Sequence, residues 1–294
     1  MTEHLKHEHK RLPTWLRKRV RASGEVLKLK KILKEKGIHT VCQAAGCPNI
    51  SECFSKPTAT FMILGDVCTR HCRFCGIKKG RPGPVDNGEP MHIAEAAAAM
   101  NLRHVVITSV TRDDLEDGGA AHFAETITQL HHALPNATIE ALIPDFSGNQ
   151  RSIDTVLNSQ LDVLNHNVET VPRLYQTIRP EANYKRSLEL LQYAKTSRSD
   201  ITTKSGLMVG LGETGEEMVR VFKDLVSIKC DALTIGQYLA PNLKAFPVRE
   251  YIHPDIFADY KKRAMSLGFG YVQAGPYVRS SFHAEDVLNH DEGV

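Results

Sequence analysis

The chain has 294 residues, of which 41% are hydrophobic and 24% charged, with a formal net charge of +3, as in many water-soluble globular proteins. It has no run of about 18 apolar residues, which excludes a membrane-spanning helix, and its start lacks the apolar stretch of a signal peptide. Its seven cysteines therefore argue for metal or redox chemistry in a reducing compartment, so we expect a cytoplasmic protein without a membrane partner.

We expect three zones along the chain: a basic arm with a cysteine-rich loop (1–58), a region of alternating strands and helices (59–240) and a C-terminal extension (241–294). Residues 1–36 carry a net charge of +8, which leaves −5 for the rest of the chain. Such an arm can bind an acidic protein, nucleic acid or an anionic surface, or it can form a solvated helix. Trp15 is the only aromatic residue among these 36 and offers little for stacking on bases, so we expect no nucleic-acid partner.

The loop that ends the arm contains Cys42, Cys47 and Cys53. Gly46 and Pro48 lie among them and allow the backbone to wrap around a bulky iron–sulfur cluster. The spacing by itself is also compatible with a small zinc site. The three cysteines are thus candidate metal ligands, and a cluster bound by them needs one further ligand for its fourth iron.

Short apolar or β-branched runs predict six strands, at residues 60–64, 104–110, 138–143, 161–165, 203–209 and 232–238. Helical patterns follow them at residues 93–101, 119–134, 150–158, 184–197 and 213–228, and again in the extension at 253–268, before an extended run at 271–284. Strands that alternate with helices predict a parallel sheet covered on both faces. The expected fold class is α/β: a partial (β/α)6 barrel of the TIM type, with the cysteine loop as an N-terminal extension and a C-terminal tail covering the site. A doubly wound open sheet remains an alternative.

Cys68, Cys72 and Cys75 follow the first predicted strand directly, with C-x3-C-x2-C spacing. Three thiolates on one short loop can bind three irons of a [4Fe–4S] cluster and leave the fourth iron open for the amino and carboxylate groups of S-adenosylmethionine (SAM). An electron from such a cluster cleaves the sulfonium and yields a 5′-deoxyadenosyl radical. The alternative is zinc, but structural zinc usually takes four ligands in paired spacing, and His71 beside Cys72 would point away from such a site. Cys230 has no cysteine neighbour, and we expect it to be buried in the core.

Polar residues gather just beyond the predicted strand ends, where α/β barrels build their active sites. Asn165, Asn167 and Glu169 follow the fourth strand, and Arg179 lies in the next turn. These four side chains are candidate contacts for the ribose and methionine parts of SAM. Helix caps and surface loops would use the same residue types, so the pattern leaves both interpretations open.

With both cysteine sets in this order and spacing, the chain resembles the lipoyl synthase family of the radical SAM superfamily. The resemblance runs from about residue 37 to 284 and includes six further blocks: TSVTRDDLEDGGA (108–120), IPDF (143–146), NHNVETV (165–171), KSGLMVGLGE (204–213), IGQYLAP (235–241) and GPYVRSS (275–281).

The resemblance implies an enzyme that inserts two sulfur atoms, at C6 and C8, into an octanoyl chain carried on a lysine of a lipoyl carrier domain. It implies two [4Fe–4S] clusters and two SAM molecules per product, because each C–S bond needs one hydrogen abstraction. The roles it assigns to the cysteines differ. Cys68, Cys72 and Cys75 serve the radical, whereas the auxiliary cluster of the other triplet, 42, 47 and 53, supplies the sulfur.

The resemblance also implies a fourth ligand for the auxiliary cluster. The family uses a serine from an RSSY block, and the corresponding serine here is Ser281. From the residues alone, a hydroxyl that caps a turn is the better interpretation, and only the resemblance reverses it. Phe282 stands where the family has tyrosine, so a hydrogen bond from that phenol is absent here.

The implied partners are octanoylated carrier domains, namely the E2 subunits of 2-oxoacid dehydrogenases and the H protein of the glycine cleavage system. The implied helpers are an electron donor such as ferredoxin or flavodoxin and an iron–sulfur cluster carrier. The basic arm would then dock the acidic carrier domain. Two alternatives are another sulfur-inserting radical SAM enzyme, such as an RNA-methylthiolating one, and a non-catalytic iron–sulfur carrier. No separate RNA-binding module is visible for the first, and the second needs no barrel.

Overall fold

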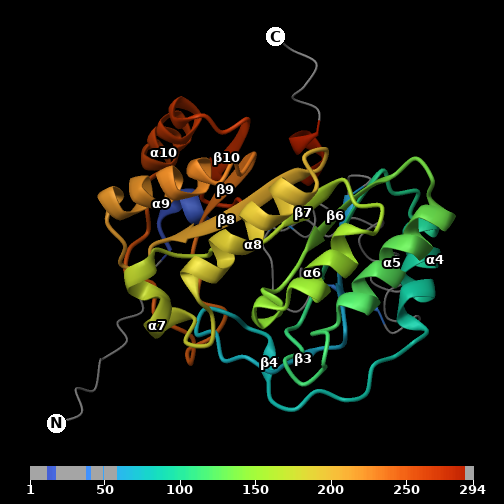
Figure 1. The fold of residues 1–294 in the computed structure, drawn as a ribbon. Helices are drawn as coiled ribbons and strands as arrows, with labels where there is room; N and C mark the ends of the chain where they lie inside the picture. The colour runs from blue at the N-terminus through green and yellow to red at the C-terminus, as the bar shows by residue number, and fades with distance from the viewer. Residues whose placement is uncertain (1–11, 18–37, 41–48, 50–57, 289–294) are drawn as a thin grey trace.

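The computed structural model describes residues 12–17, 38–40, 49 and 58–288 of the chain, and Figure 1 shows their arrangement. The centre is an eight-stranded sheet with the order β1-β2-β5-β6-β7-β8-β9-β10. Its strands are β1 (His39–Thr40), β2 (Thr58–Ile63), β5 (His104–Ser109), β6 (Thr138–Leu142), β7 (Val163–Asn165), β8 (Thr202–Val209), β9 (Ala232–Gln237) and β10 (Tyr271–Gly275). β1 runs antiparallel to β2, and the strands from β2 to β10 are parallel to one another.

The order of the parallel strands follows the chain, without the reversal that a doubly wound sheet requires. Among the described strands, β10 pairs only with β9, so the sheet stays open between β10 and β1. The predicted partial barrel is therefore confirmed. All six predicted strands are present, with ends that shift by up to two residues. β10 adds a seventh parallel strand where the sequence indicated only an extended run.

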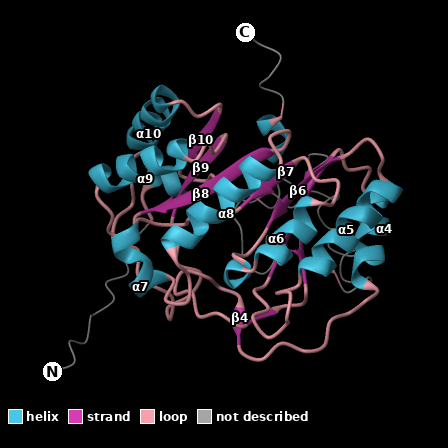
Figure 2. Cartoon of the chain, viewed as in Figure 1, coloured by secondary structure: helices cyan, strands magenta, loops and turns pink. Residues whose placement is uncertain are grey.

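The helices line one side of the curved sheet (Figure 2). They are α4 (Glu89–Ala99), α5 (Ala120–Ala133), α6 (Gln150–Leu157), α7 (Tyr175–Ile178), α8 (Tyr184–Ser197), α9 (Gly215–Ser227) and α10 (Pro254–Leu267), with the 3-10 turns η1 (Thr14–Leu16), η2 (Phe146–Gly148), η3 (Pro172–Leu174) and η4 (Ala284–Val287). α9 illustrates why they form where they do: Thr214 and Glu217 make a capping box at its start, and its buried side chains share one face. α7 was not predicted, because a single turn has no readable periodicity.

Residues 276–288 return along the inner face of the sheet, opposite the helices. This path needs Gly236 in β9, because a Cβ there would overlap the carbonyl oxygen of Val278. At its far end the Thr58 hydroxyl donates to Glu285 at 3.2 Å, and Val287 packs against the first residues of β9 and β10. The segment thus runs from the carboxyl ends of the strands to their amino ends. In Figure 1 the red turn η4 lies at the end of the molecule away from the short strands β3 (Val67–Cys68) and β4 (Lys78–Lys79).

The described part of the arm, η1, rests on the body of the protein. Leu16 is buried, and the ring of Trp15 packs edge-on against His253, with 5.0 Å between ring centroids. His253 caps α10, so the arm is anchored beside the start of that helix. Within the described ranges, no helix is long and apolar enough to cross a membrane.

Candidate functional site

The loop with Cys68, Cys72 and Cys75 lies at the carboxyl ends of the parallel strands. Two short parallel strands, β3 (Val67–Cys68) and β4 (Lys78–Lys79), enclose it. The Cys75 backbone N–H donates to the Cys72 carbonyl at 3.3 Å, and all three cysteines are half-buried with free thiols. The predicted position after the first barrel strand is thus the one observed.

The three thiols lie close enough to influence one another's pKa. Burial raises the pKa of Cys75 to about 11, and the neighbouring thiols Cys72 and Cys68 add to that rise. Burial likewise raises the pKa of Cys72, although Arg179 opposes it. Three half-buried thiolates repel unless a cation neutralises them, which is the situation that a bound metal relieves. Of the described cysteines, only Cys230 lies elsewhere. It is buried in the core as predicted and donates to backbone carbonyls.

Asn167, Glu169 and Arg179 come together beside Cys72. The Asn167 side-chain amide donates to the Glu169 carboxylate at 3.2 Å, and Arg179 Nη1 donates to the Asn167 and Val168 carbonyls at 3.0 and 3.2 Å. Among the described side chains, Asn167 Oδ1 and Arg179 Nε are buried without a hydrogen-bond partner. Buried polar atoms of this kind require an explanation, and a polar ligand supplies one. Three thiols beside these atoms fit a three-ligand cluster whose open iron takes SAM.

Glu169 is held against β8 by its backbone. Its φ of 65° lies in the left-handed region, which is unfavourable for a residue with a long side chain. Its N–H donates to the Gly206 carbonyl at 2.9 Å, and its carbonyl accepts from the Met208 N–H at 2.8 Å. Burial raises the pKa of the carboxyl group, and Arg179 partly offsets the effect. Strained, buried residues cluster at functional sites, which supports the predicted role of Glu169.

Asn165 lies deeper in the barrel, apart from the other three predicted SAM contacts. Its amide donates to Glu140 at 2.7 Å, and Lys204 Nζ donates to both oxygens of the same carboxylate, at 2.9 and 3.1 Å. Lys204 and Glu140 are both 0% exposed. Burial opposes ionisation of Glu140, but Lys204 and His104 outweigh it and lower its pKa. The barrel interior therefore contains a closed charged cluster below the predicted SAM site.

Ser281 lies in the segment along the inner face. Hydrogen bonds to two residues just before it, Tyr277 and Ser280, show what this part of the segment contacts. The preceding residue, Ser280, accepts a hydrogen bond from the Asn167 amide at 2.5 Å. Cys42, Cys47 and Cys53 lie outside the described residues. Asn49 of their loop is described, however, and its amide donates to the Tyr277 carbonyl at 2.6 Å. The auxiliary cysteine loop therefore contacts the chain four residues before Ser281.

Two groups of charged residues escaped prediction. Glu140 and Lys204 each stand as the one charged residue in a buried strand, and a charge inside a predicted buried strand is the signal that could have indicated them. Arg70 pairs with Asp113 and Asp145, which lie 43 and 75 positions away along the chain. No local pattern reveals partners at such separations.

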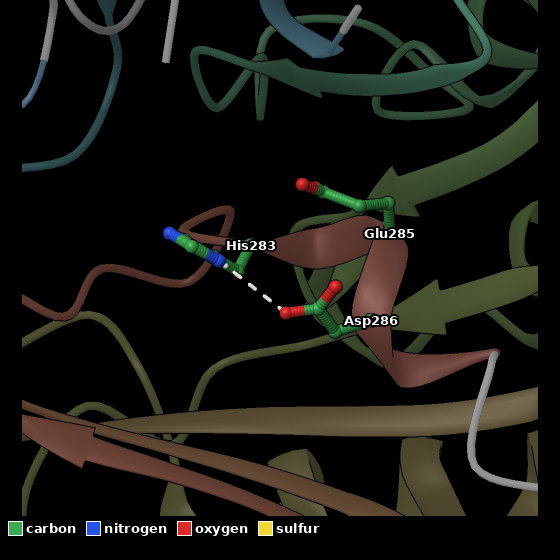
Figure 3. A group of neighbouring side chains, drawn as sticks. All are labelled: His283, Glu285 and Asp286. Atoms are coloured by element: carbon green, nitrogen blue, oxygen red, sulfur yellow. Dashed lines mark hydrogen bonds and ion pairs between the residues drawn. The ribbon is translucent and has the colours of Figure 1, made fainter. Parts of the chain in front are cut away.

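Three further polar side chains lie close together on η4 (Figure 3): His283, Glu285 and Asp286, whose possible ligand atoms are within 4.8 Å of one another. Asp286 is 3.3 Å from His283 Nδ1, and Glu285 accepts from Thr58. The first contact stabilises the turn, and the second binds it to the start of β2. We therefore interpret the group as an anchor of the C-terminal segment.

Comparisons with known proteins agree with this geometry. Residues 62–225 match the family described as the Radical SAM superfamily. A lipoyl synthase of Caldicellulosiruptor saccharolyticus is 57% identical over 274 residues, which cover 93% of this chain and 96% of that protein. A lipoyl synthase of Caldanaerobacter subterraneus subsp. tengcongensis is 54% identical, with coverage of 96% and 99%. The crystal structure of Streptococcus suis SuiB bound to S-adenosylmethionine shares the fold, with a TM-score of 0.60 at 9% identity over 77% of this chain and 55% of that chain.

Proposed function

Because this chain belongs to the lipoyl synthase family of the radical SAM superfamily, we propose how its residues divide the work of sulfur insertion between two sites. The protein is a radical SAM sulfurtransferase that inserts sulfur into octanoyl groups on lipoyl carrier proteins and so makes the lipoyl cofactor. It uses [4Fe–4S] clusters and SAM.

Cys68, Cys72 and Cys75 would hold the radical cluster, on the short loop that carries all three. When bound there, a reduced cluster and SAM supply a carbon radical that abstracts hydrogen from an unactivated carbon, which acid–base groups cannot do. Arg179 offers a buried cation and Glu169 a buried carboxylate, which suit the carboxylate oxygens and the amino N–H groups of the methionine moiety. Asn167 and Asn165 complete the proposed set, Asn167 beside the thiols and Asn165 below them.

Cys42, Cys47, Cys53 and Ser281 would hold the auxiliary cluster that donates sulfur. The observation that carries this proposal is a pair of hydrogen bonds to the residues just before Ser281, at Tyr277 and Ser280. Asn49 of the cysteine loop binds Tyr277, and Asn167 of the SAM site binds Ser280. The segment that leads to Ser281 therefore contacts both the cysteine loop, through Asn49, and the proposed SAM site, through Asn167.

The deciding experiment is anaerobic turnover of reconstituted protein with an octanoyl-lysine peptide, SAM and a strong reductant, followed by mass analysis. We expect two added sulfur atoms, two 5′-deoxyadenosine molecules per product and iron and sulfide for two clusters per chain. A single cluster per chain would contradict the sulfur-donor assignment. Methylthiolation of RNA in place of peptide sulfuration would favour another radical SAM enzyme, and absence of SAM cleavage would favour an iron–sulfur carrier.

We propose that the physiological partners are the E2 subunits of 2-oxoacid dehydrogenases and the glycine cleavage H protein. A ferredoxin or flavodoxin would act as reductant, and an iron–sulfur carrier would rebuild the auxiliary cluster, all in the cytoplasm. The C-terminal extension (241–294) would cover the site.

The basic arm (1–36) would attract the acidic carrier domain electrostatically, and added salt would screen this attraction and shorten its range. Replacing Lys28, Lys30, Lys31 and Lys34 with glutamine should weaken carrier binding and flatten its salt dependence, as measured by titration at several ionic strengths. The same changes should leave turnover of a short octanoyl peptide intact. Unchanged carrier affinity would contradict this role.

A further inference from the structure

Arg70 lies in the middle of the radical cysteine loop, between Cys68 and Cys72, yet its side chain is only 6% exposed. Its neighbour His71, in the same loop, is 62% exposed. Two adjacent residues of one loop therefore differ completely in their environment. A guanidinium is costly to bury without partners, so its contacts explain why it is there.

The Arg70 guanidinium binds two carboxylates at once. Nε and Nη2 donate to the two oxygens of Asp113 at 2.7 and 2.8 Å, which is the bidentate arrangement that makes such pairs strong. Nη2 also donates to Asp145 at 2.6 Å. The network continues outward, because the other oxygen of Asp145 accepts from Arg186 of α8 at 3.1 Å.

The two carboxylates belong to the ends of neighbouring strands. Asp113 follows β5, and Asp145 follows β6 and caps η2. Asp145 is 1% exposed, and Arg70 holds its pKa down to about 2 against the opposing effect of burial. Asp145 therefore stays ionised, and the arginine is tied to a rigid part of the barrel.

The rest of the loop depends on few side-chain contacts. Its backbone is bonded to the barrel at Thr69, whose N–H donates to the Thr111 carbonyl at 3.1 Å, and at Arg73, whose N–H donates to the Ile178 carbonyl at 2.8 Å. Between these two points, Arg70 makes the buried side-chain attachment, whereas His71 contacts Glu181 on the exposed side. Of the three residues between Cys68 and Cys72, Arg70 is thus the one whose side chain is fixed in the barrel interior.

We propose that Arg70 is a positioning residue, which fixes the loop and so sets the positions of its three thiols before any metal arrives. The inference rests on the proposed assignment of these cysteines to the radical cluster. Arg70 acts through Asp113 and Asp145, and residues that orient metal ligands in this way commonly change metal affinity by about 10- to 100-fold when removed.

The test compares reconstituted wild type, Arg70→Ala, Arg70→Lys and the matched control His71→Ala. Each protein is reduced and incubated with an iron chelator. The measurement is the half-life of the EPR signal from the reduced cluster that responds to added SAM. That response distinguishes the radical cluster from the auxiliary one. We expect Arg70→Ala to shorten the half-life by roughly 10-fold. Arg70→Lys should give an intermediate value, because an ammonium keeps the charge but cannot bridge both carboxylates. His71→Ala should match wild type.

A merely structural role would lower the thermal stability of the cluster-free protein and affect both clusters equally. If Arg70→Ala does not fold, Asp113→Asn, whose side chain is 35% exposed, serves in its place and should show the same selective loss. Wild-type half-lives in whichever of these variants folds would overturn the proposal. Failure of wild type to insert sulfur, with the SAM-responsive signal intact, would count against the proposed function and leave this inference standing.

Discussion

Asn167 connects the two halves of the site through one amide group, which donates to Glu169 on the SAM side and to Ser280 on the sulfur side. Removing the serine hydroxyl deprives the C-terminal segment of a bond worth about 1 kcal/mol. The radical cysteines are untouched by that change. Loss of this hydrogen bond should therefore disturb the position of Ser281 relative to SAM more than it disturbs radical formation.

We expect Ser280→Ala to uncouple the two reactions. Formation of 5′-deoxyadenosine should continue, while the yield of sulfurated peptide per 5′-deoxyadenosine falls several-fold, as measured by mass analysis of both products. Ser280→Thr, which retains the hydroxyl, should restore the ratio. An unchanged ratio in Ser280→Ala would show that Asn167 does not position this segment.

At the scale of the strands, the buried pair of Lys204 in β8 and Glu140 in β6 spans β7 between them. Lys204→Met leaves a buried carboxylate without its cation, which should lower the free energy of unfolding by about 3–5 kcal/mol. The double variant Glu140→Gln/Lys204→Met should recover much of that loss, because no uncompensated charge remains. Urea unfolding of the cluster-free protein measures both. Equal losses in the single and double variants would contradict this account.

His166, just after β7, fastens that strand to its neighbours: Nδ1 lies 2.8 Å from the Ile143 carbonyl, and Nε2 lies 2.9 Å from Ser187 of α8. Burial lowers the pKa of His166 from 6.5 to about 4. Below pH 6.5, His166 binds a proton in the unfolded chain, whereas in the folded chain it stays neutral until the pH approaches 4. The free energy of unfolding should therefore fall with decreasing pH across this window, by up to roughly 3 kcal/mol.

Urea unfolding between pH 7.5 and 5 measures this slope. His166→Gln should flatten it, because glutamine does not titrate, whereas replacing the exposed His92 with glutamine should not. The same slope in His166→Gln and wild type would assign the pH dependence to other groups.

A helix, strand or loop could be predicted from the sequence where the pattern that indicates it lies within its own residues. Apolar runs alternating with helical patterns predicted six of the parallel strands, because each strand of a doubly covered sheet shows its burial in its own residues. The cysteine loop was predictable because its ligands lie within eight residues. β10 was indicated only as extended, since Gly275 and Pro276 obscure its end and its partner β9 lies over 30 residues earlier. The attachments of Arg70 and Asn49 join distant segments and depend on how the barrel folds.

For the whole molecule, the described C-terminal segment (276–288) runs along the inner face of a sheet that stays open between β10 and β1. Gly236 is essential to that arrangement, since any side chain there meets the Val278 carbonyl. Gly236→Ala should therefore displace the segment, increase proteolysis after Gly275 and reduce sulfur insertion more than SAM cleavage. Gly83→Ala is the matched control, because a Cβ at Gly83 meets open space. Wild-type protease resistance in Gly236→Ala would show that the segment is held in another way.

The same segment has a consequence for how the protein is made. Residues 276–288 come after every strand of the sheet in the chain, so the strands that they contact are all synthesised before them. A barrel that pairs its strands before this segment docks would expose its inner face to solvent. We expect delivery of iron and sulfide to be easiest at that stage, before the segment closes over the face.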